Sequence, residues 1–138
     1  MTEGDFDLGG NSYSDGVFSV TTGVMTSQTI YSRPITVEAE MRSSQISECI
    51  SMTLFADNDD KNAEISHEIG GWTNRWRFFP GDNRGTVGDV TSWRTVKLEL
   101  DANTEVKFYV DGDLKYTTDS SKSSGYLRFP KVCFNADL

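Results

Sequence analysis

The residues best suited to chemistry in this chain are two glutamates in one short alternating segment. Glu64 and Glu68 stand four positions apart in AEISHEI, with Ser66 midway between them. Successive side chains of a β-strand point to opposite faces, so these three side chains would share one face of a strand. Such a pair of carboxylates is either two solvated charges, a ligand-binding surface or a catalytic pair.

Aromatic and basic residues follow this segment directly. Trp72 and Trp76 are either core residues or platforms on which a sugar ring stacks its C–H face, and Arg75 lies between them. The arginine is either a surface charge or a partner for one of the two glutamates. Together these residues predict a sugar-binding surface. Trp93, which precedes a strongly alternating segment, is expected in the core.

A second group of acidic residues forms a turn between two apolar segments. Asp57 and Asp59 belong to the run DNDD, which offers the oxygen ligands that Ca²⁺ prefers but does not match an EF-hand loop. The turn is therefore either simply solvated or a calcium site. The only histidine, His67, is expected to be half-buried and hydrogen-bonded.

The composition restricts the classes of function. A net charge of −8 argues against a nucleic-acid partner, which would require a basic surface. The 36% hydrophobic and 12% aromatic content is that of a globular protein rather than a disordered one. No apolar run of about 18 residues is present, so we expect no membrane insertion. Cys49 and Cys133 are either two buried thiols or one disulfide, which would indicate an oxidising compartment.

The periodicity of the chain predicts strands almost throughout. Alternating or apolar segments separated by Gly, Asn and Asp turns recur at the spacing of a β-sandwich, and no segment sustains a helical repeat. The expected strands include 35–41, 50–55, 74–79, 92–100 and 106–110, and the expected loops include 42–47, 80–89 and 118–125. Asp111-Gly112 predicts a two-residue type I′ hairpin. We predict an all-β, antiparallel two-sheet sandwich with little or no helix, forming a single domain over residues 1–138.

Three segments resemble the concanavalin A-like lectin and glucanase superfamily, and most closely the laminarinase and lichenase type of retaining endo-β-glucanase. The segments are ITVEAEMRSS, ISMTLFADNDDKNAEISHEIGG and SWRTVKLELDANTEVKFYVDGDLKYT. The last contains the Tyr-Val-Asp-Gly hairpin that is common across the superfamily. The resemblance implies a jelly roll with a ligand-binding concave sheet.

The resemblance also implies roles for the glutamates. In those glucanases a Glu-x-Asp-x-Glu strand supplies the nucleophile and the acid/base, which correspond here to Glu64 and Glu68. Ser66 stands where the family has Asp, and a serine offers a hydrogen bond but no third charge to tune the pair. The superfamily often holds a structural calcium near its termini, where Asp5, Asp7 or Asp137 could serve. No other cofactor is implied.

The leading hypothesis is a carbohydrate-binding, lectin-like domain that recognises a polysaccharide or oligosaccharide. Its expected ligand-binding residues are those introduced above: Glu64, Ser66, Glu68, Trp72, Arg75 and Trp76. A minimal retaining β-glucan hydrolase that uses Glu64 and Glu68 is the first alternative. A structural or adhesion module of a cell surface or virion, part of a larger assembly with no small ligand, is the second. An extracellular or surface location fits each reading, although the N-terminus MTEGDFDLGG does not read as a signal peptide.

Overall fold

The computed structural model describes residues 3–21, 24–42, 51–55, 61–70, 73–81, 83–86 and 92–130. One short 3₁₀ turn, η1 (Glu3–Asp5), precedes the strands. The strands of the first half are β1 (Phe6–Asp7), β2 (Ser12–Ser14), β3 (Val17–Ser19), β4 (Val24–Ser32), β5 (Ile35–Met41), β6 (Ser51–Phe55) and β7 (Lys61–Gly70). Those of the second half are β8 (Thr73–Phe79), β9 (Asn83–Thr86), β10 (Arg94–Leu100), β11 (Glu105–Val110), β12 (Asp113–Asp119) and β13 (Ser124–Pro130).

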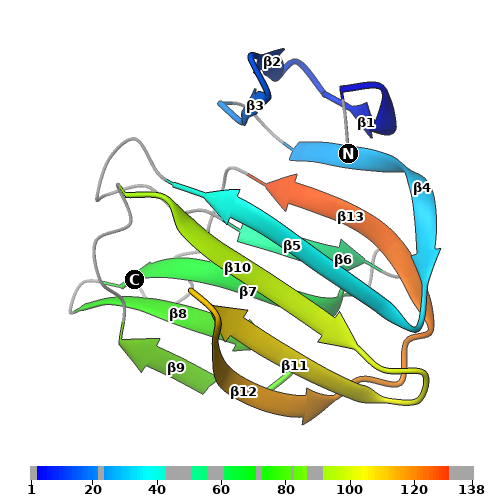
Figure 1. The fold of residues 1–138 in the computed structure, drawn as a ribbon, viewed down its shortest axis with the longest axis vertical. Helices are drawn as coiled ribbons and strands as arrows, with labels where there is room; N and C mark the ends of the chain where they lie inside the picture. Colours follow the sequence, from blue (N-terminus) through cyan, green and yellow to red (C-terminus); the bar gives the residue numbers. More distant parts are fainter. Residues whose placement is uncertain are drawn as a thin grey trace.

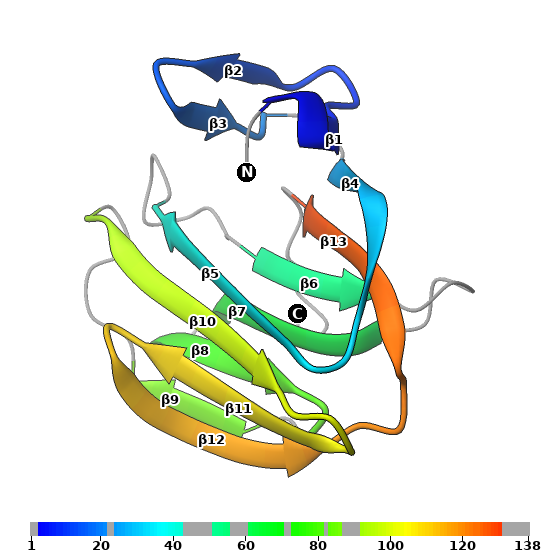
Figure 2. The same cartoon turned by 45° about the vertical axis from the view of Figure 1, so that its right-hand side comes forward.

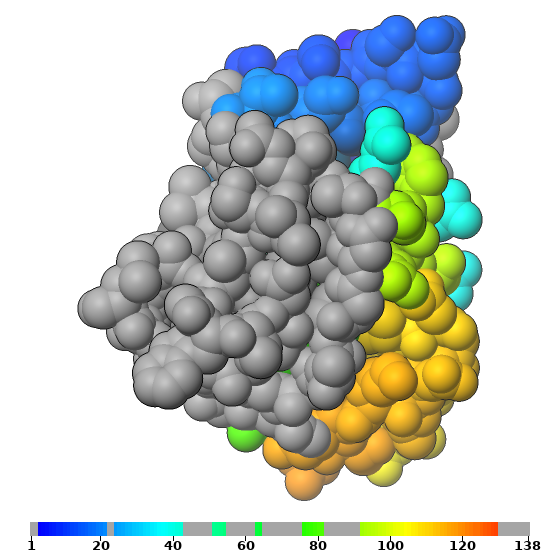
Figure 3. All heavy atoms as spheres, turned by 90° about the vertical axis from the view of Figure 1, so that its left-hand side faces the viewer, coloured from blue at the N-terminus to red at the C-terminus, as the bar shows by residue number. Residues whose placement is uncertain are grey.

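Two antiparallel sheets form the sandwich. The large sheet has the strand order β1-β4-β13-β6-β7-β8-β9, and the small sheet has the order β12-β11-β10-β5. Figures 1 and 2 show the two layers, with the separate β2–β3 hairpin at one end. Figure 3 shows the same N-terminal segment in blue at one end of the molecule, with the orange β12 segment towards the other. The predicted all-β antiparallel sandwich is confirmed.

The small sheet is built from sequences that alternate strictly. In β10 from Val96 onward and in β11, every second residue is buried, and valine, leucine and phenylalanine side chains supply the buried face. Phe108 of β11 meets Phe78 of β8 across the core, with ring centroids 5.2 Å apart. Fully burying a side chain of this size contributes roughly 1.5–3 kcal/mol to folding. This contact joins the two sheets at the centre of the core.

The predicted hairpin between β11 and β12 is confirmed. Asp111 and Gly112 both have positive φ, at 51° and 85°, as a type I′ turn requires. The Asp111 carboxylate accepts hydrogen bonds from the Thr95 backbone N–H at 3.1 Å and from Arg94 Nη1 at 2.9 Å. The turn is therefore anchored to the start of the neighbouring strand β10.

Three expectations about local structure are wrong, and one strand was not predicted. The unpredicted strand is β4, whose buried face carries a serine, Ser27, in place of an apolar residue. β9 lies inside the predicted loop 80–89, and β12 and β13 extend into the predicted loop 118–125. Trp93 is 47% exposed rather than buried: it lies just before β10, and its ring contacts the Arg42 guanidinium, 4.9 Å from the ring centroid.

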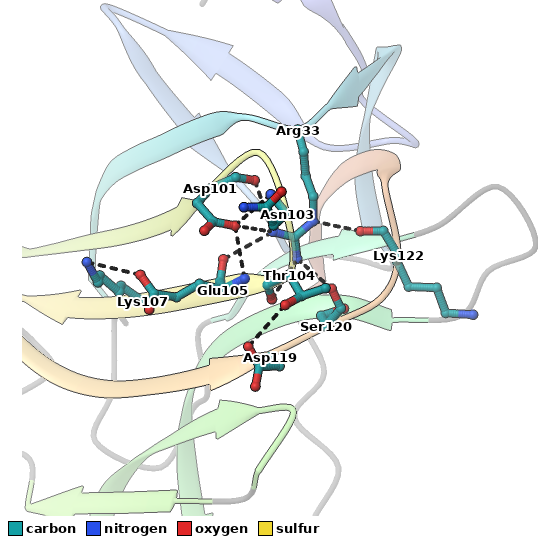
Figure 4. Close-up of polar contacts among 9 residues, drawn as sticks. All are labelled: Arg33, Asp101, Asn103, Thr104, Glu105, Lys107, Asp119, Ser120 and Lys122. Atoms are coloured by element: carbon teal, nitrogen blue, oxygen red, sulfur yellow. Dashed lines mark hydrogen bonds and ion pairs between the residues drawn. The ribbon is translucent and has the colours of Figure 1, made fainter.

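Arg33 ties together three loops at one end of the sandwich (Figure 4). Its side chain is only 4% exposed. Its guanidinium donates to five backbone carbonyls, at distances of 2.8–3.4 Å: those of Asp101, Thr104, Glu105, Ser120 and Lys122. Burial lowers the pKa of Arg33, and the nearby carboxylates of Asp101 and Asp119 oppose that shift. Its side chain thus connects the start of β5 with the β10–β11 and β12–β13 connections.

Candidate functional site

Glu64 lies near the middle of β7, which pairs with β6 on one side and β8 on the other. The register aligns Thr53, Glu64 and Phe79 in one row across these strands. The adjacent positions, Ala63 and Phe78, are buried in the core between the sheets. Because side chains alternate along a strand, the row containing Glu64 lies on the outer face of the large sheet. We call this surface the Glu64 face.

A chain of hydrogen bonds holds the Glu64 carboxylate. Thr53 Oγ1 donates to Glu64 Oε2 at 2.7 Å, and Ser51 Oγ lies 3.2 Å from Thr53 Oγ1. A hydroxyl has one proton to donate, and Thr53 uses it on the carboxylate, so Ser51 must donate to Thr53. Ser51 and Thr53 are 4% and 0% exposed, whereas Glu64 is half-buried. The buried Thr53 hydroxyl, supported by Ser51, therefore fixes one oxygen of the Glu64 carboxylate, while the Glu64 side chain stays partly exposed.

Arginines occupy the same face on both sides of Glu64. Arg128 of β13 pairs with Thr53, and Arg77 of β8 pairs with Ser66, one row further along. Both arginine side chains are half-buried. Carboxylate and guanidinium groups placed together offer acceptors and forked donors to a ligand rich in hydroxyl groups.

The other residues predicted for this site hold adjacent register positions. Ser66 and Glu68 lie two and four residues beyond Glu64 on β7, and Glu68 pairs with Arg75 of β8. By backbone register, these three positions have the same parity along the strands as Glu64. The β-strand predicted for this segment is present, and the site roles of Ser66, Glu68 and Arg75 stay predictions.

Trp76 does not belong to the Glu64 face. It pairs with His67, and it alternates with Arg75 and Arg77 on β8. Its side chain is 3% exposed and forms part of the core between the sheets. The structure therefore removes Trp76 from the expected sugar-stacking residues, because an indole enclosed in the core presents no ring face to a ligand.

Several predicted residues lie outside the described part of the chain. They are Trp72, Asp57, Asp59, Asp137, Cys49 and Cys133. Asp5 and Asp7 are described and exposed, and the Asp7 carboxylate accepts a hydrogen bond from the Gly9 N–H at 3.2 Å. Within the described ranges, no group of three or more His, Cys, Asp or Glu side chains is arranged to hold a metal ion. The calcium site stays a prediction.

Three contributors to the Glu64 face, Ser51, Thr53 and Arg128, were missed in the sequence. Thr53 lies in SMTLF, where the polar Ser51 and Thr53 alternate with the apolar Met52 and Leu54. That alternation was the available signal, because it assigns the two hydroxyls to one face of the strand. Arg128 has no comparable local signal, since only the pairing of β13 with β6 brings it beside Thr53.

Comparisons with known proteins find similarity in three-dimensional structure but not in sequence. No protein-family model matches the chain, and no curated protein matches its sequence. The β-glucanase of Bacillus licheniformis matches with a TM-score of 0.59 at 18% identity, over 93% of this chain and 69% of the glucanase. The carbohydrate-binding module CBM66 of Bacillus subtilis matches with a TM-score of 0.56 at 18% identity, over 80% of this chain and 74% of the module.

A larger enzyme gives a similar match. β-Agarase A of Zobellia galactanivorans, in complex with oligoagarose, matches with a TM-score of 0.58 at 12% identity, over 83% of this chain and 56% of the agarase. This chain thus spans little more than half the length of the agarase. Within the described residues, no helix is long and apolar enough to cross a membrane. The chain thus shares the antiparallel two-sheet β-sandwich fold of these proteins.

Proposed function

We propose that this protein binds a polysaccharide or oligosaccharide on the Glu64 face. The observation that carries the proposal is the Ser51–Thr53–Glu64 hydrogen-bond chain, which fixes a carboxylate oxygen at a half-buried position. An oriented carboxylate accepts hydrogen bonds from sugar hydroxyls without losing side-chain freedom on binding. Arg77 and Arg128 add donors on the same face.

The structural neighbours support this class of ligand. A carbohydrate-binding module and an agarase solved with oligoagarose both share the fold. Fold alone does not fix function, so the argument for this chain rests on its own polar face. Binding is favoured over hydrolysis because Ser66 stands between the two glutamates where the resembling glucanases carry an aspartate.

The test is retention on insoluble or immobilised glycans. Laminarin, lichenan, agarose, carrageenan and alginate are offered to the full chain and to the Glu64→Gln variant. We expect retention on at least one polymer, and a loss of about tenfold in affinity for Glu64→Gln, since one charge-assisted hydrogen bond contributes about 1.5 kcal/mol. Glu3→Gln, an exposed carboxylate of η1, is the control and should bind as the parent does. Equal binding by Glu64→Gln would refute the assignment of the site.

The same samples test hydrolysis by the release of reducing ends. In that reading Glu64 is the nucleophile and Glu68 the acid/base of a double displacement. Release that Glu64→Gln abolishes would replace the binding proposal with the hydrolase. Retention without release supports the binding module. A chain that neither binds nor cleaves any polymer would instead support the adhesion or structural module, whose partner is another protein.

A further inference from the structure

The outer face of the small sheet contains two hollows. The first has a volume of about 390 Å³ and is lined by Glu38, Thr95, Lys97, Tyr109, Asp111 and Gly112. The second has a volume of about 290 Å³, and its lining includes Thr36, Glu99 and Lys107. Small-ligand sites occupy roughly 300–1,000 Å³, so the first hollow is large enough for a sugar ring.

The two hollows follow one another along the strands. Glu38, Lys97 and Tyr109 form one row across β5, β10 and β11, and Thr36, Glu99 and Lys107 form the row two residues along. The lining of the two hollows runs along β10 from Thr95 to Asp101. At a rise of about 3.3 Å per residue, this stretch is about 20 Å long, which suits a chain-like ligand better than a single ring.

An aromatic ring stands on the same outer face. Lys97 Nζ lies 4.0 Å from the centroid of the half-buried Tyr109 ring. Trp93, which immediately precedes β10 and is two residues before Thr95, is 47% exposed and contacts Arg42. A flat ring beside carboxylate, hydroxyl and ammonium groups matches a sugar, which combines an apolar C–H face with hydroxyl groups.

The charges of the lining favour a neutral ligand. Two ammonium groups, those of Lys97 and Lys107, face a larger number of carboxylates. The carboxylates are those of Glu38, Glu99, Asp101, Glu105 and Asp111. Ion pairs compensate most of these carboxylates: Lys107 Nζ lies 3.1 Å from Glu105 Oε1 and Lys97 Nζ lies 3.8 Å from Glu99 Oε2. Arg94 and Arg33 pair in the same way with Asp111 and Asp101, at 2.9 Å and 3.6 Å. The surface therefore carries only a small excess of negative charge, which favours a neutral polymer over a sulfated or uronic one.

We propose that this outer face of the small sheet is a second binding surface, which takes a neutral polysaccharide chain across Tyr109. It lies on the opposite side of the sandwich from the Glu64 face, because each face points away from the shared core. The location rests on the hollows and the Tyr109 ring, whereas the glycan class of the ligand rests on the proposed function. One protein molecule would then hold two polymer chains, and bivalent attachment would strengthen retention on a fibre.

The experiment counts binding sites by isothermal titration calorimetry, using neutral oligosaccharides of laminarin, lichenan and agarose and charged oligosaccharides of carrageenan and alginate. The full chain should bind two equivalents of one of these neutral oligosaccharides. Tyr109→Ala should weaken one of the two sites about tenfold and leave the other unchanged, whereas Glu64→Gln should do the reverse. Glu38→Ala alters an exposed side chain of the first hollow and should weaken the same site as Tyr109→Ala, so the test does not depend on one variant folding. Lys115→Ala, exposed on β12, is the matched control.

The outcomes separate the two proposals. One site that is lost in Glu64→Gln and untouched by Tyr109→Ala and Glu38→Ala would overturn the second surface and leave the Glu64 face standing. One site that responds only to Tyr109→Ala and Glu38→Ala would overturn the Glu64 face alone. The assignment of a neutral ligand would be overturned if carrageenan or alginate bound at the Tyr109 site and no neutral oligosaccharide did.

Discussion

At the scale of single residues, the buried hydroxyl of Ser27 forms hydrogen bonds with backbone groups of two strands. Ser27 is 3% exposed on the core-facing side of β4. Its hydroxyl donates to the Thr29 carbonyl at 2.8 Å and accepts from the Leu127 N–H at 2.9 Å. Leu127 lies where the register between β13 and β4 shifts, so the ladder there is irregular. The serine therefore replaces a hydrogen bond that the regular ladder would have made.

Ser27→Ala should destabilise the fold by about 1–3 kcal/mol, because it leaves a buried N–H and a carbonyl without that partner. Urea unfolding measures the effect. Ser14→Ala, at an exposed position of β2, should change the free energy of unfolding by less than about 0.5 kcal/mol. Equal effects of the two substitutions would show that the Ser27 hydroxyl contributes nothing specific.

At the scale of strands and turns, the alternation of apolar and polar residues predicts best those strands that have one apolar, buried face and one polar, exposed face. β10 and β11 carry apolar residues at every second position, and Asp111-Gly112 fixes the turn that follows. β4 escaped prediction because Ser27 interrupts its apolar face. Trp93 is exposed just before β10, although its large indole predicts a core residue.

For the candidate site, alternation along β7 was enough to assign Glu64, Ser66 and Glu68 to one face. It was not enough to identify their neighbours. Arg128 reaches Thr53 only through the pairing of β13 with β6, and the two strands lie far apart in the sequence. Trp76 was misjudged because the alternation along β8 gives two faces but does not say which one meets the core. Long-range pairing decides that choice.

Gly9, in the connection between β1 and β2, gives a test at this scale. Its φ is +56°, and a Cβ there would lie 2.5 Å from the Val24 carbonyl oxygen of β4. Gly16 also has a positive φ, +79°, but open space surrounds its Cβ position. Both alanine substitutions carry the strain of the left-handed region, about 1–2 kcal/mol.

Gly9→Ala should cost a further 1–3 kcal/mol or so, because the β4 backbone must shift to relieve the contact. Thermal unfolding of both variants measures the difference. A melting temperature of Gly9→Ala equal to that of Gly16→Ala would contradict the close approach of this turn to β4.

At the scale of the whole molecule, one side chain holds the end of the sandwich where three connections converge. The guanidinium of Arg33 donates to carbonyls from the β10–β11 and β12–β13 connections, and its own chain segment leads from β4 into β5 (Figure 4). All of these acceptors are backbone atoms, so the contacts depend on the arginine side chain and on the backbone conformation of the two connections. The large sheet and the small sheet are thereby fixed to each other at this end.

Arg33→Met should destabilise the fold by about 3–5 kcal/mol, since it leaves several carbonyls without their charged donor in a site of low exposure. Lys115→Met breaks only an exposed ion pair with Asp113, 3.9 Å long, and should cost less than about 1 kcal/mol. Chemical denaturation compares the two variants. A loss of under 1 kcal/mol for Arg33→Met would mean that water replaces the guanidinium at these carbonyls.

The position of β13 has a consequence for how the protein is made. In the large sheet β13 lies between β4 and β6, although it is the last of the described strands to be synthesised. Ribosomes add about 5–20 residues per second, so a nascent chain carries β4 and β6 for seconds before β13 can fill the gap between them. During that interval both strands have unpaired edges, which neighbouring nascent chains could pair with. The large sheet is therefore completed only after β13 has been synthesised, and until then the unpaired edges of β4 and β6 are open to pairing with neighbouring chains.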